Sequence, residues 1–148
     1  MAATAWAIYN KAKNKIAEGT IPLNGSIWRT QLHTSASNAS VATFSLVASI
    51  TNEVANGNGY VTGGKTLPTP TWTTGASAGQ YAFDSGDPIW TASGGTIPNI
   101  KFAVIRNSTG AGVGHALCWS KLTTAQFTLA QDNTLTIQMN ANGIFTLT

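Results

Sequence analysis

Residues 97–107 read IPNIKFAVIRN and form the strongest β pattern in this 148-residue chain. Four apolar residues in a row, Phe102 to Ile105, occupy the middle of the stretch. A short apolar run rich in β-branched and aromatic side chains is typical of a buried strand. The stretch therefore predicts a β domain with this strand in its core.

Two stretches that precede this run also predict extended structure. Residues 26–34, SIWRTQLHT, alternate between two sets of side chains, which predicts a half-buried strand with His33 on its polar face. Residues 65–74, KTLPTPTWTT, predict an edge segment, because Pro68 and Pro70 have no N–H group to donate to a neighbouring strand.

The remaining strands are shorter. They are predicted at 79–85 and 114–122, while the C-terminal residues 134–148, TLTIQMNANGIFTLT, predict a β-hairpin with the short link ANG. Seven or eight strands with frequent turns favour a β-sandwich or a jelly-roll-like double sheet. Large aromatic rings help to fill such a core, and three tryptophans are expected there: Trp72, Trp90 and Trp119.

One α-helix is predicted, over residues 3–18. The side chains of its apolar stripe are Trp6, Tyr9, Ala12 and Ile16, and Gly19 marks its end. The stripe needs a cover, which either this chain's own sheet or a neighbouring subunit supplies. We therefore expect an N-terminal helix within residues 1–20, followed by a single β domain over residues 21–148.

The composition favours association with other proteins. Charged residues make up only 9% of the chain, against roughly 25% in typical soluble domains. The net charge is +3, but apart from Lys11, Lys13 and Lys15 the basic residues are scattered, so no nucleic-acid partner is predicted. The single cysteine, Cys118, excludes an internal disulfide, and no apolar run is long enough to predict a membrane span.

Residues Gly59–Thr66, GYVTGGKT, match the P-loop pattern G-x-x-x-x-G-K-[ST]. A P-loop needs a strand before it and a helix after it, so that backbone N–H groups face the phosphates. Here a polar loop precedes the match, and Pro68 and Pro70 forbid a regular helix after it. We therefore predict no nucleotide site. The glycines are expected to permit positive φ angles in tight turns, and Lys65 is expected to be an ordinary solvated charge.

Residues able to carry out catalysis are few and dispersed. Asp84 and Asp87, in DSGDP, are the only near pair of carboxylates, and we expect them to cap a turn. The only histidines are His33 and His115, and no G-x-S-x-G nucleophile motif accompanies them. These observations predict no enzyme, no catalytic residue, no cofactor and no metal site.

Five segments of the chain carry a resemblance to a known family. They are TAWAIYNKAKNKIAEG (4–19), ITNEVANGNGYVTGGKTL (50–67), FDSGDPIWTASGGTI (83–97), KFAVIRN (101–107) and NTLTIQMNANGIFTLT (133–148). Together they resemble a family of small structural virion proteins of tailed bacteriophages, and the similarity runs from the N-terminal helix to the last residue. The resemblance implies a virion component, and it brings no catalytic residues with it.

Among virion roles we favour a capsid decoration, or cement, protein, made in the host cytoplasm and bound to the capsid surface. Its expected partners are the major capsid protein and copies of itself, with a trimer as the symmetric closure. A neck, tail or baseplate protein is the alternative, and a carbohydrate-binding virion module is a further one. The candidate interface residues are Trp6, Tyr9, Lys13 and Ile16, followed by the loops at 35–42 and 107–114.

Overall fold

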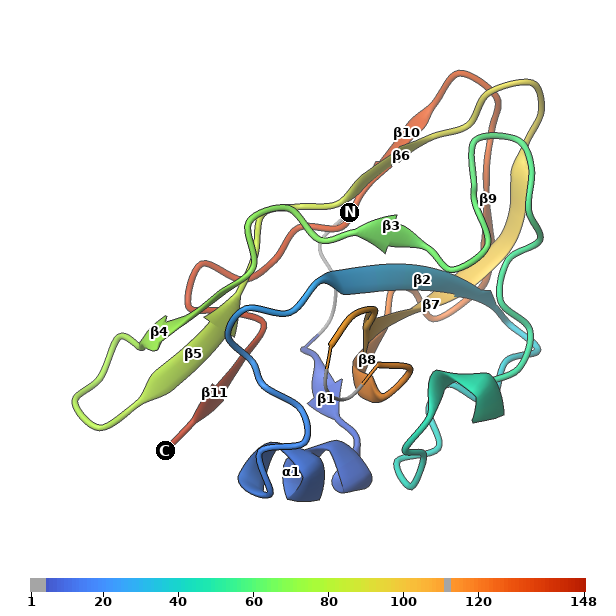
Figure 1. Cartoon of the computed structure of the whole chain (residues 1–148). Helices are drawn as coiled ribbons and strands as arrows, with labels where there is room; N and C mark the ends of the chain where they lie inside the picture. The colour runs from blue at the N-terminus through green and yellow to red at the C-terminus, as the bar shows by residue number, and fades with distance from the viewer. Residues whose placement is uncertain (1–4, 111–112) are drawn as a thin grey trace.

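The computed structural model describes residues 5–110 and 113–148, and it shows a mainly β protein with one N-terminal helix (Figure 1). This confirms the predicted fold class. The elements in chain order are β1 (Ala7–Ile8), α1 (Asn10–Ala17), β2 (Trp28–Thr34), the 3-10 turn η1 (Val47–Ser49), β3 (Lys65–Thr66), β4 (Thr71–Thr74), β5 (Tyr81–Asp84), β6 (Ile89–Thr91), β7 (Ile97–Asn107), β8 (Ala116–Lys121), β9 (Phe127–Leu129), β10 (Thr134–Thr136) and β11 (Phe145–Leu147). The strands are more numerous than the seven or eight predicted, because many of them contain only two to four residues, and they form three antiparallel sheets.

The largest sheet contains six strands, in the order β1-β8-β7-β2-β3, and β9 also pairs with β7. Its longest strand, β7, covers residues 97–107 as the sequence predicts. Phe102 to Ile105 are buried because β2 and β8 flank this strand and core side chains cover both of its faces. Val104 enters one core cluster and Ala103 enters the other.

Strand β2 is also buried on both faces, so the prediction of a half-buried strand at 26–34 is wrong. Four consecutive side chains are at most 5% exposed: Thr30, Gln31, Leu32 and His33. An alternating pattern indicates that one face of a strand is exposed to solvent, but residues 51–53 cover that face of β2. Nε2 of Gln31 donates to Oε2 of Glu53, and Nδ1 of His33 lies 3.1 Å from the Thr51 carbonyl oxygen.

The two smaller sheets extend in opposite directions from the large one in Figure 1. Strands β11, β5 and β4 pair in that order and project at the left of the view; we call this sheet the wing. Strands β6 and β10 form a two-stranded sheet at the upper right. The edge segment predicted at 65–74 is confirmed, because β3 ends the large sheet and β4 ends the wing.

The predicted C-terminal hairpin is wrong, because its two strands pair with different partners. Strand β10 pairs with β6, and β11 pairs with β5. Ile137, just after β10, belongs to one buried cluster, whereas Ile144, just before β11, belongs to the other. Burial of both isoleucines separates the strands, and the short link between them crosses from one cluster to the other.

The N-terminal helix is shorter than predicted. Residues 3 and 4 lie outside the described residues, and α1 begins at Asn10 because the residues before it pair with the large sheet. Ala7 and Ile8 form β1 against β8, and the N–H group of Tyr9 donates to the Leu117 carbonyl oxygen at 3.1 Å. The helix ends at Ala17, and Gly19 follows with a positive φ of 73°, in agreement with the predicted stop.

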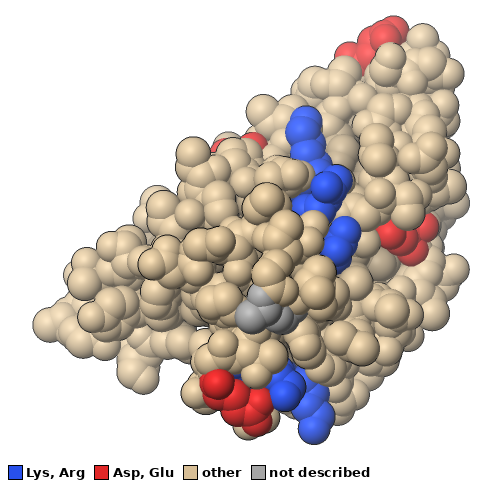
Figure 2. Space-filling view, viewed as in Figure 1, with Lys and Arg blue, Asp and Glu red and all other residues tan. Residues whose placement is uncertain are grey.

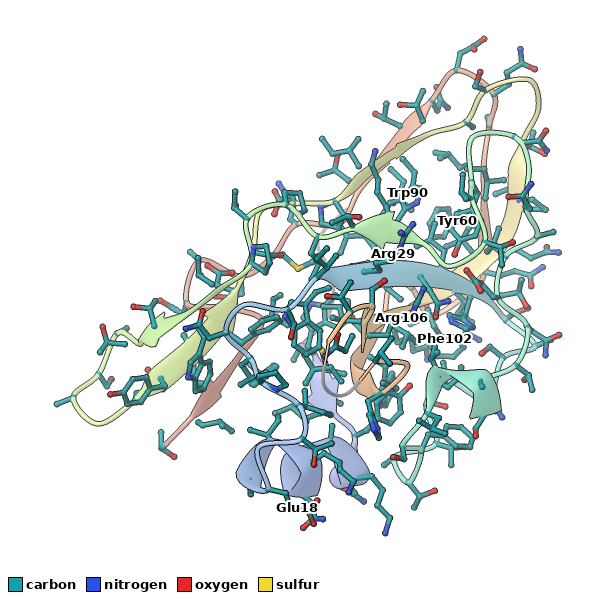
Figure 3. All side chains as sticks on the ribbon, in the orientation of Figure 1. Glu18, Arg29, Tyr60, Trp90, Phe102 and Arg106 are labelled. Carbon is teal, nitrogen blue, oxygen red and sulfur yellow. The ribbon has the colours of Figure 1, made fainter. Side chains whose placement is uncertain are left out.

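Buried apolar side chains form two clusters that share the large sheet. The first includes Tyr9, Trp28 and Phe83. The second includes Tyr60 and Trp90, which lie near β3 and β6 in Figure 3. Trp90 is 3% exposed, as predicted for a core residue. The other two tryptophans expected in the core, Trp72 and Trp119, are only partly buried and pack against the first cluster.

Candidate functional site

Tyr9, one of the four predicted interface residues, lies entirely inside its own chain. It is 0% exposed, and its hydroxyl donates to the Ala39 carbonyl oxygen at 2.6 Å. Burial, and to a smaller extent the nearby Cys118, raises the pKa of the Tyr9 phenol. The cover for this part of the amphipathic stripe therefore comes from the chain itself.

The other three predicted interface residues differ in exposure. Lys13 is exposed, whereas Trp6 and Ile16 are half-buried. Trp6 packs against both core clusters and Ile16 packs against the first. Trp6 also lines a hollow of about 370 Å³ beside β11.

Backbone hydrogen bonds connect the predicted N-terminal segment to the predicted loop 35–42, and the predicted loop 107–114 to the residues that follow 35–42 in the chain. The N–H group of Asn10 donates to the Ala42 carbonyl oxygen at 2.8 Å, and that of Val47 donates to the Gly114 carbonyl oxygen at 2.9 Å. Three aliphatic side chains here are 44–59% exposed: Val41 and Val113 on the predicted loops, and Leu46, which lies outside them. We call the surface made by Lys13, Val41, Leu46 and Val113 the N-terminal face.

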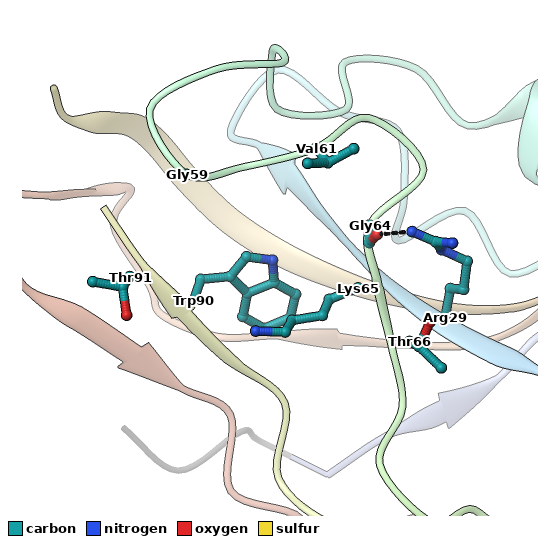
Figure 4. Close-up of a pocket in the computed structure, with 8 residues that line it drawn as sticks. All are labelled: Arg29, Gly59, Val61, Gly64, Lys65, Thr66, Trp90 and Thr91. Atoms are coloured by element: carbon teal, nitrogen blue, oxygen red, sulfur yellow. Dashed lines mark hydrogen bonds between the residues drawn. The ribbon is translucent and has the colours of Figure 1, made fainter. Parts of the chain in front are cut away.

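A second candidate site is a groove of about 550 Å³ between β3 and β6 (Figure 4). It is lined by Arg29, Gly59, Val61, Gly64, Lys65, Thr66, Trp90 and Thr91. The P-loop-like segment therefore forms one wall of the groove. We call residues 53–66 the glycine loop.

Two glycines hold the glycine loop against its neighbours. Gly59 has a φ of +89°, and a Cβ atom at this position would lie 2.1 Å from the Thr91 carbonyl oxygen on β6. Gly64 has a φ of +76°, and its Cβ atom would lie 2.1 Å from the Thr30 carbonyl oxygen on β2. The predicted positive φ angles are confirmed, and close backbone approach is a second reason for glycine at both positions.

The amide groups of Gly63 and Gly64 are already bonded inside the protein. The N–H group of Gly63 donates to Oε1 of Glu53 at 2.7 Å, and that of Gly64 donates to the Val61 carbonyl oxygen at 3.0 Å. The Tyr60 hydroxyl also donates to Oε1 of Glu53, at 2.6 Å. An internal carboxylate and an internal carbonyl group thus accept from the two glycine amides that a P-loop would offer to phosphate.

The carbonyl groups of the same loop face arginines. Arg29 donates from Nε to the Gly63 oxygen at 3.1 Å and from Nη2 to the Gly64 oxygen, and Arg106 donates from Nη2 to the Gly63 oxygen at 3.2 Å. After Thr66 the chain continues from β3 into Pro68 and not into a helix. The segment therefore lacks the strand–loop–helix geometry on which P-loop binding of phosphate depends.

Three basic side chains gather at this groove. Arg29 on β2 and Lys65 on β3 line it, and Arg106 on β7 lies beside Arg29; Figure 2 shows basic side chains in a short row on this face of the molecule. Within the described part of the chain, the one ion pair closer than 4.0 Å joins Lys15 to Glu18, so none of the three has a carboxylate at that distance. Burial and the neighbouring Arg29 lower the pKa of Arg106.

Sequence reasoning expected Lys65 to be a solvated charge, and this is only partly correct. Lys65 is exposed, but its Nζ donates to the Ile89 carbonyl oxygen at 2.6 Å, across the groove. Sequence reasoning missed Arg29 and Arg106. They are far apart in the chain, and only the pairing of β2 with β7 places them directly opposite each other.

The remaining candidates for chemistry have structural contacts. Oδ1 of Asp84 accepts from the N–H group of Ser85, which agrees with the predicted turn cap. Oδ1 of Asp87 instead accepts from the N–H group of Met139, on the distant C-terminal segment. His33 is 1% exposed, contrary to its predicted place on a polar face, and burial lowers its pKa. His115 is half-buried, with Nδ1 3.3 Å from the Ser45 hydroxyl.

Comparisons of the chain with protein-family models, with curated proteins and with solved structures gave no match. Across residues 5–110 and 113–148, no three histidine, cysteine, aspartate or glutamate residues form a group that could hold a metal ion. The same residues include no helix long and apolar enough to cross a membrane.

Proposed function

We propose that this chain is a structural component of a tailed-phage virion, and within the virion a capsid decoration protein. In this role it binds the major capsid protein and stabilises the shell by burying surface across the junctions between capsid subunits. The resemblance of its sequence segments to small virion proteins supports the general role. The low fraction of charged residues, 9%, supports a role in which much of the surface is packed against neighbouring proteins.

The observation that carries the proposal is the N-terminal face. Val41, Leu46 and Val113 expose aliphatic surface, and backbone hydrogen bonds hold their loops together. Specific interfaces bury apolar side chains at their centre and are depleted in charge there. Lys13 lies at the edge of this surface and is suited to an acidic partner.

Self-association belongs to the same proposal. Most oligomers close with a point-group symmetry, and a trimer matches positions where three capsid subunits meet. Tyr9 is buried inside its own chain. Contacts between copies therefore use the exposed residues of the N-terminal face and not the full apolar stripe.

The deciding experiment is to assemble particles with and without this protein and to count its copies per particle. We expect hundreds of copies, and particles of normal shape that lose resistance to heat when the protein is absent. Between about six and a few dozen copies, or particles that lack tails or necks, would instead identify a neck, tail or baseplate protein.

A pair of variants tests the surface itself. Leu46→Asp combined with Val113→Asp is expected to abolish incorporation into particles while leaving the isolated protein folded, because both side chains are exposed. Tyr81→Ser on the wing is the control, since Tyr81 is 49% exposed but lies outside the N-terminal face. Equal loss of incorporation in both variants would count against the N-terminal face.

One observation favours a second function, that of a carbohydrate-binding virion module. Trp72 and Tyr81 stack on one face of the wing, with ring centroids 5.8 Å apart and planes 26° apart. Partly exposed aromatic rings on a projecting sheet can form a platform for a sugar ring. Binding of the isolated protein to a glycan array, lost in Tyr81→Ser, would favour this function.

A further inference from the structure

We propose that the groove between β3 and β6 binds an extended acidic peptide segment of a partner protein. The proposal does not depend on the virion role. It rests on the charges at the groove, on the strand edges that border it and on the way its wall is built.

The charges at the groove lack a countercharge. Two of the eight Lys and Arg residues of a chain with few charges line it, Arg29 and Lys65, and Arg106 lies beside Arg29 and donates to the Gly63 carbonyl oxygen. Arg29 and Arg106 stand directly opposite each other on paired strands, an arrangement that is unfavourable for like charges. A carboxylate in the groove would relieve this repulsion.

Glu53 is the acidic residue whose charge acts on Arg106, but its carboxylate is already committed elsewhere. Oε1 accepts from the Gly63 N–H group and from the Tyr60 hydroxyl, and Oε2 accepts from Nε2 of Gln31. Nε of Arg106 is buried and has no hydrogen-bond partner within the described residues. Among the described residues, no carboxylate lies within 4.0 Å of the two lining cations, Arg29 and Lys65, and their positive charge is what the groove offers to a ligand.

The borders of the groove are two strand edges. The N–H group of Leu67 donates to the Trp28 carbonyl oxygen, so the alternation of an antiparallel pair turns the backbone N–H and C=O groups of Thr66 away from β2. Next to β6, the N–H group of Ala92 donates to the Asn133 carbonyl oxygen, and the N–H group of Ile137 donates to the Pro88 carbonyl oxygen. In an antiparallel pair, hydrogen-bonded and non-hydrogen-bonded positions alternate, so the backbone N–H and C=O groups of Ile89 point away from β10. Lys65 reaches the Ile89 oxygen from β3, which shows that these groups face the groove.

An exposed strand edge pairs readily with an extended peptide, whose backbone supplies matching hydrogen-bond groups. Side chains on the peptide then give specificity. In this groove the neighbouring cations select carboxylates. The two edges and the two lining cations, Arg29 and Lys65, together favour an acidic segment in extended conformation as the occupant.

The wall of the groove is built before any ligand arrives. Gly59 and Gly64 allow the glycine loop to pack closely against β6 and β2. Arg29 and Arg106 both donate hydrogen bonds to the Gly63 carbonyl oxygen of this loop. A preformed site loses little conformational entropy when it binds. The volume of about 550 Å³ lies within the range of roughly 300–1,000 Å³ usual for ligand sites.

Two observations favour a peptide over a nucleotide or a nucleic acid. The N–H groups of Gly63 and Gly64, which would hold a phosphate, donate to internal acceptors. Trp90 lines the groove but is only 3% exposed, so it offers no ring face on which a base can stack.

The test is an NMR titration of the isotope-labelled full chain with a ten-residue peptide of alternating Glu and Thr, at low salt. Its matched control is the peptide of alternating Gln and Thr. We expect the acidic peptide to shift the amide signals of Thr66 and Ile89, and we expect little effect from the neutral peptide. Raising the salt concentration should weaken binding, because charge attraction carries much of it.

Two charge-reversal variants sharpen the test. Lys65→Glu is expected to weaken binding about tenfold or more. Lys11→Glu, on the exposed surface of α1, makes the same change in net charge and is expected to leave the site intact. The proposal fails if neither peptide shifts these signals, if both peptides shift them equally, or if the two variants weaken binding equally. Displacement of the peptide by ATP, with ATP binding lost in Lys65→Glu, would identify a phosphate site and also overturn the proposal.

Discussion

The N-terminal segment, residues 5–18, and the glycine loop both carry conspicuous sequence patterns, and the fold uses the two in opposite ways. The apolar stripe of the first was expected to be covered by this chain or by a neighbour, and it supplied interface candidates, yet Tyr9 and Ala12 are buried within the chain. The glycines of the second predicted only tight turns, yet this loop forms one wall of a groove with basic side chains.

The difference shows what each kind of pattern reports. An apolar stripe reports that a face is covered, without specifying which chain covers it. Glycines indicate that the backbone adopts a positive φ angle or that another segment approaches it closely, without specifying which segment that is. Each prediction below tests one side of this comparison.

The largest effect is expected for Gly64→Ala, in the glycine loop. We expect a loss of about 3 kcal/mol or more in the free energy of unfolding, because left-handed strain adds to a clash with the Thr30 carbonyl oxygen. Gly94→Ala is the matched control, since Gly94 has nearly the same φ, +77°, and open space around it. That change should reduce stability by about 1 kcal/mol in the same denaturant titration. Equal losses would show that close approach is unimportant at Gly64.

The next effect is expected for Glu53→Ala, which removes the internal acceptor of the glycine loop. Gly63, Tyr60 and Gln31 would each lose a hydrogen bond, so we expect a loss of about 2–3 kcal/mol in unfolding free energy. Glu53→Gln keeps an acceptor oxygen and should lose less. If Glu53→Ala is as stable as the unchanged protein, the network does not hold the loop.

On the N-terminal side, Tyr9→Phe should reduce the stability of the isolated chain by about 1 kcal/mol. It removes the hydrogen bond from the hydroxyl to the buried Ala39 carbonyl oxygen. Tyr81→Phe, at an exposed position, should leave stability unchanged. Thermal unfolding of the monomer compares the two. A Tyr9→Phe variant that unfolds at the original temperature would mean that Tyr9 is not anchored in cis.

A smaller effect is expected from His33, which lies on β2 and forms a β-bridge with Glu53, the first residue of the glycine loop. Burial lowers its folded pKa, so below about pH 6.5 the unfolded chain binds a proton that the folded chain does not. Stability from this group is present above that pH and is lost as the pH falls towards the folded pKa. Melting temperatures measured from pH 7 to 5 should fall less in His33→Gln than in the unchanged protein, and His115→Gln serves as the control.

The smallest effect on stability is expected for Lys65→Ala, because the side chain is exposed and makes one hydrogen bond. The unfolding free energy should change by no more than about 0.5 kcal/mol. We also expect ATP and GTP to produce no thermal shift in the unchanged protein. A nucleotide-dependent shift that Lys65→Ala abolishes would contradict our interpretation of the loop.

Local patterns predicted an element correctly where its own residues determine its structure. The apolar run Phe102 to Ile105 marked β7, and the prolines at 68 and 70 marked edge structure. The prediction failed where distant segments provide the cover, as for His33 in β2. The C-terminal hairpin failed for the same reason, because Ile137 and Ile144 are drawn into different clusters.

The sequence by itself determined a mainly β domain, an N-terminal helix that stops near Gly19, and turns at its glycines. These properties depend on side-chain periodicity and on backbone freedom, both of which act over a few residues. The tertiary structure alone decided that Arg29 lies opposite Arg106, that Glu53 accepts from the Gly63 N–H group, and that Tyr9 is covered by its own chain. Those contacts join segments that are separated along the chain, so their formation depends on strand pairing and packing that no local pattern specifies.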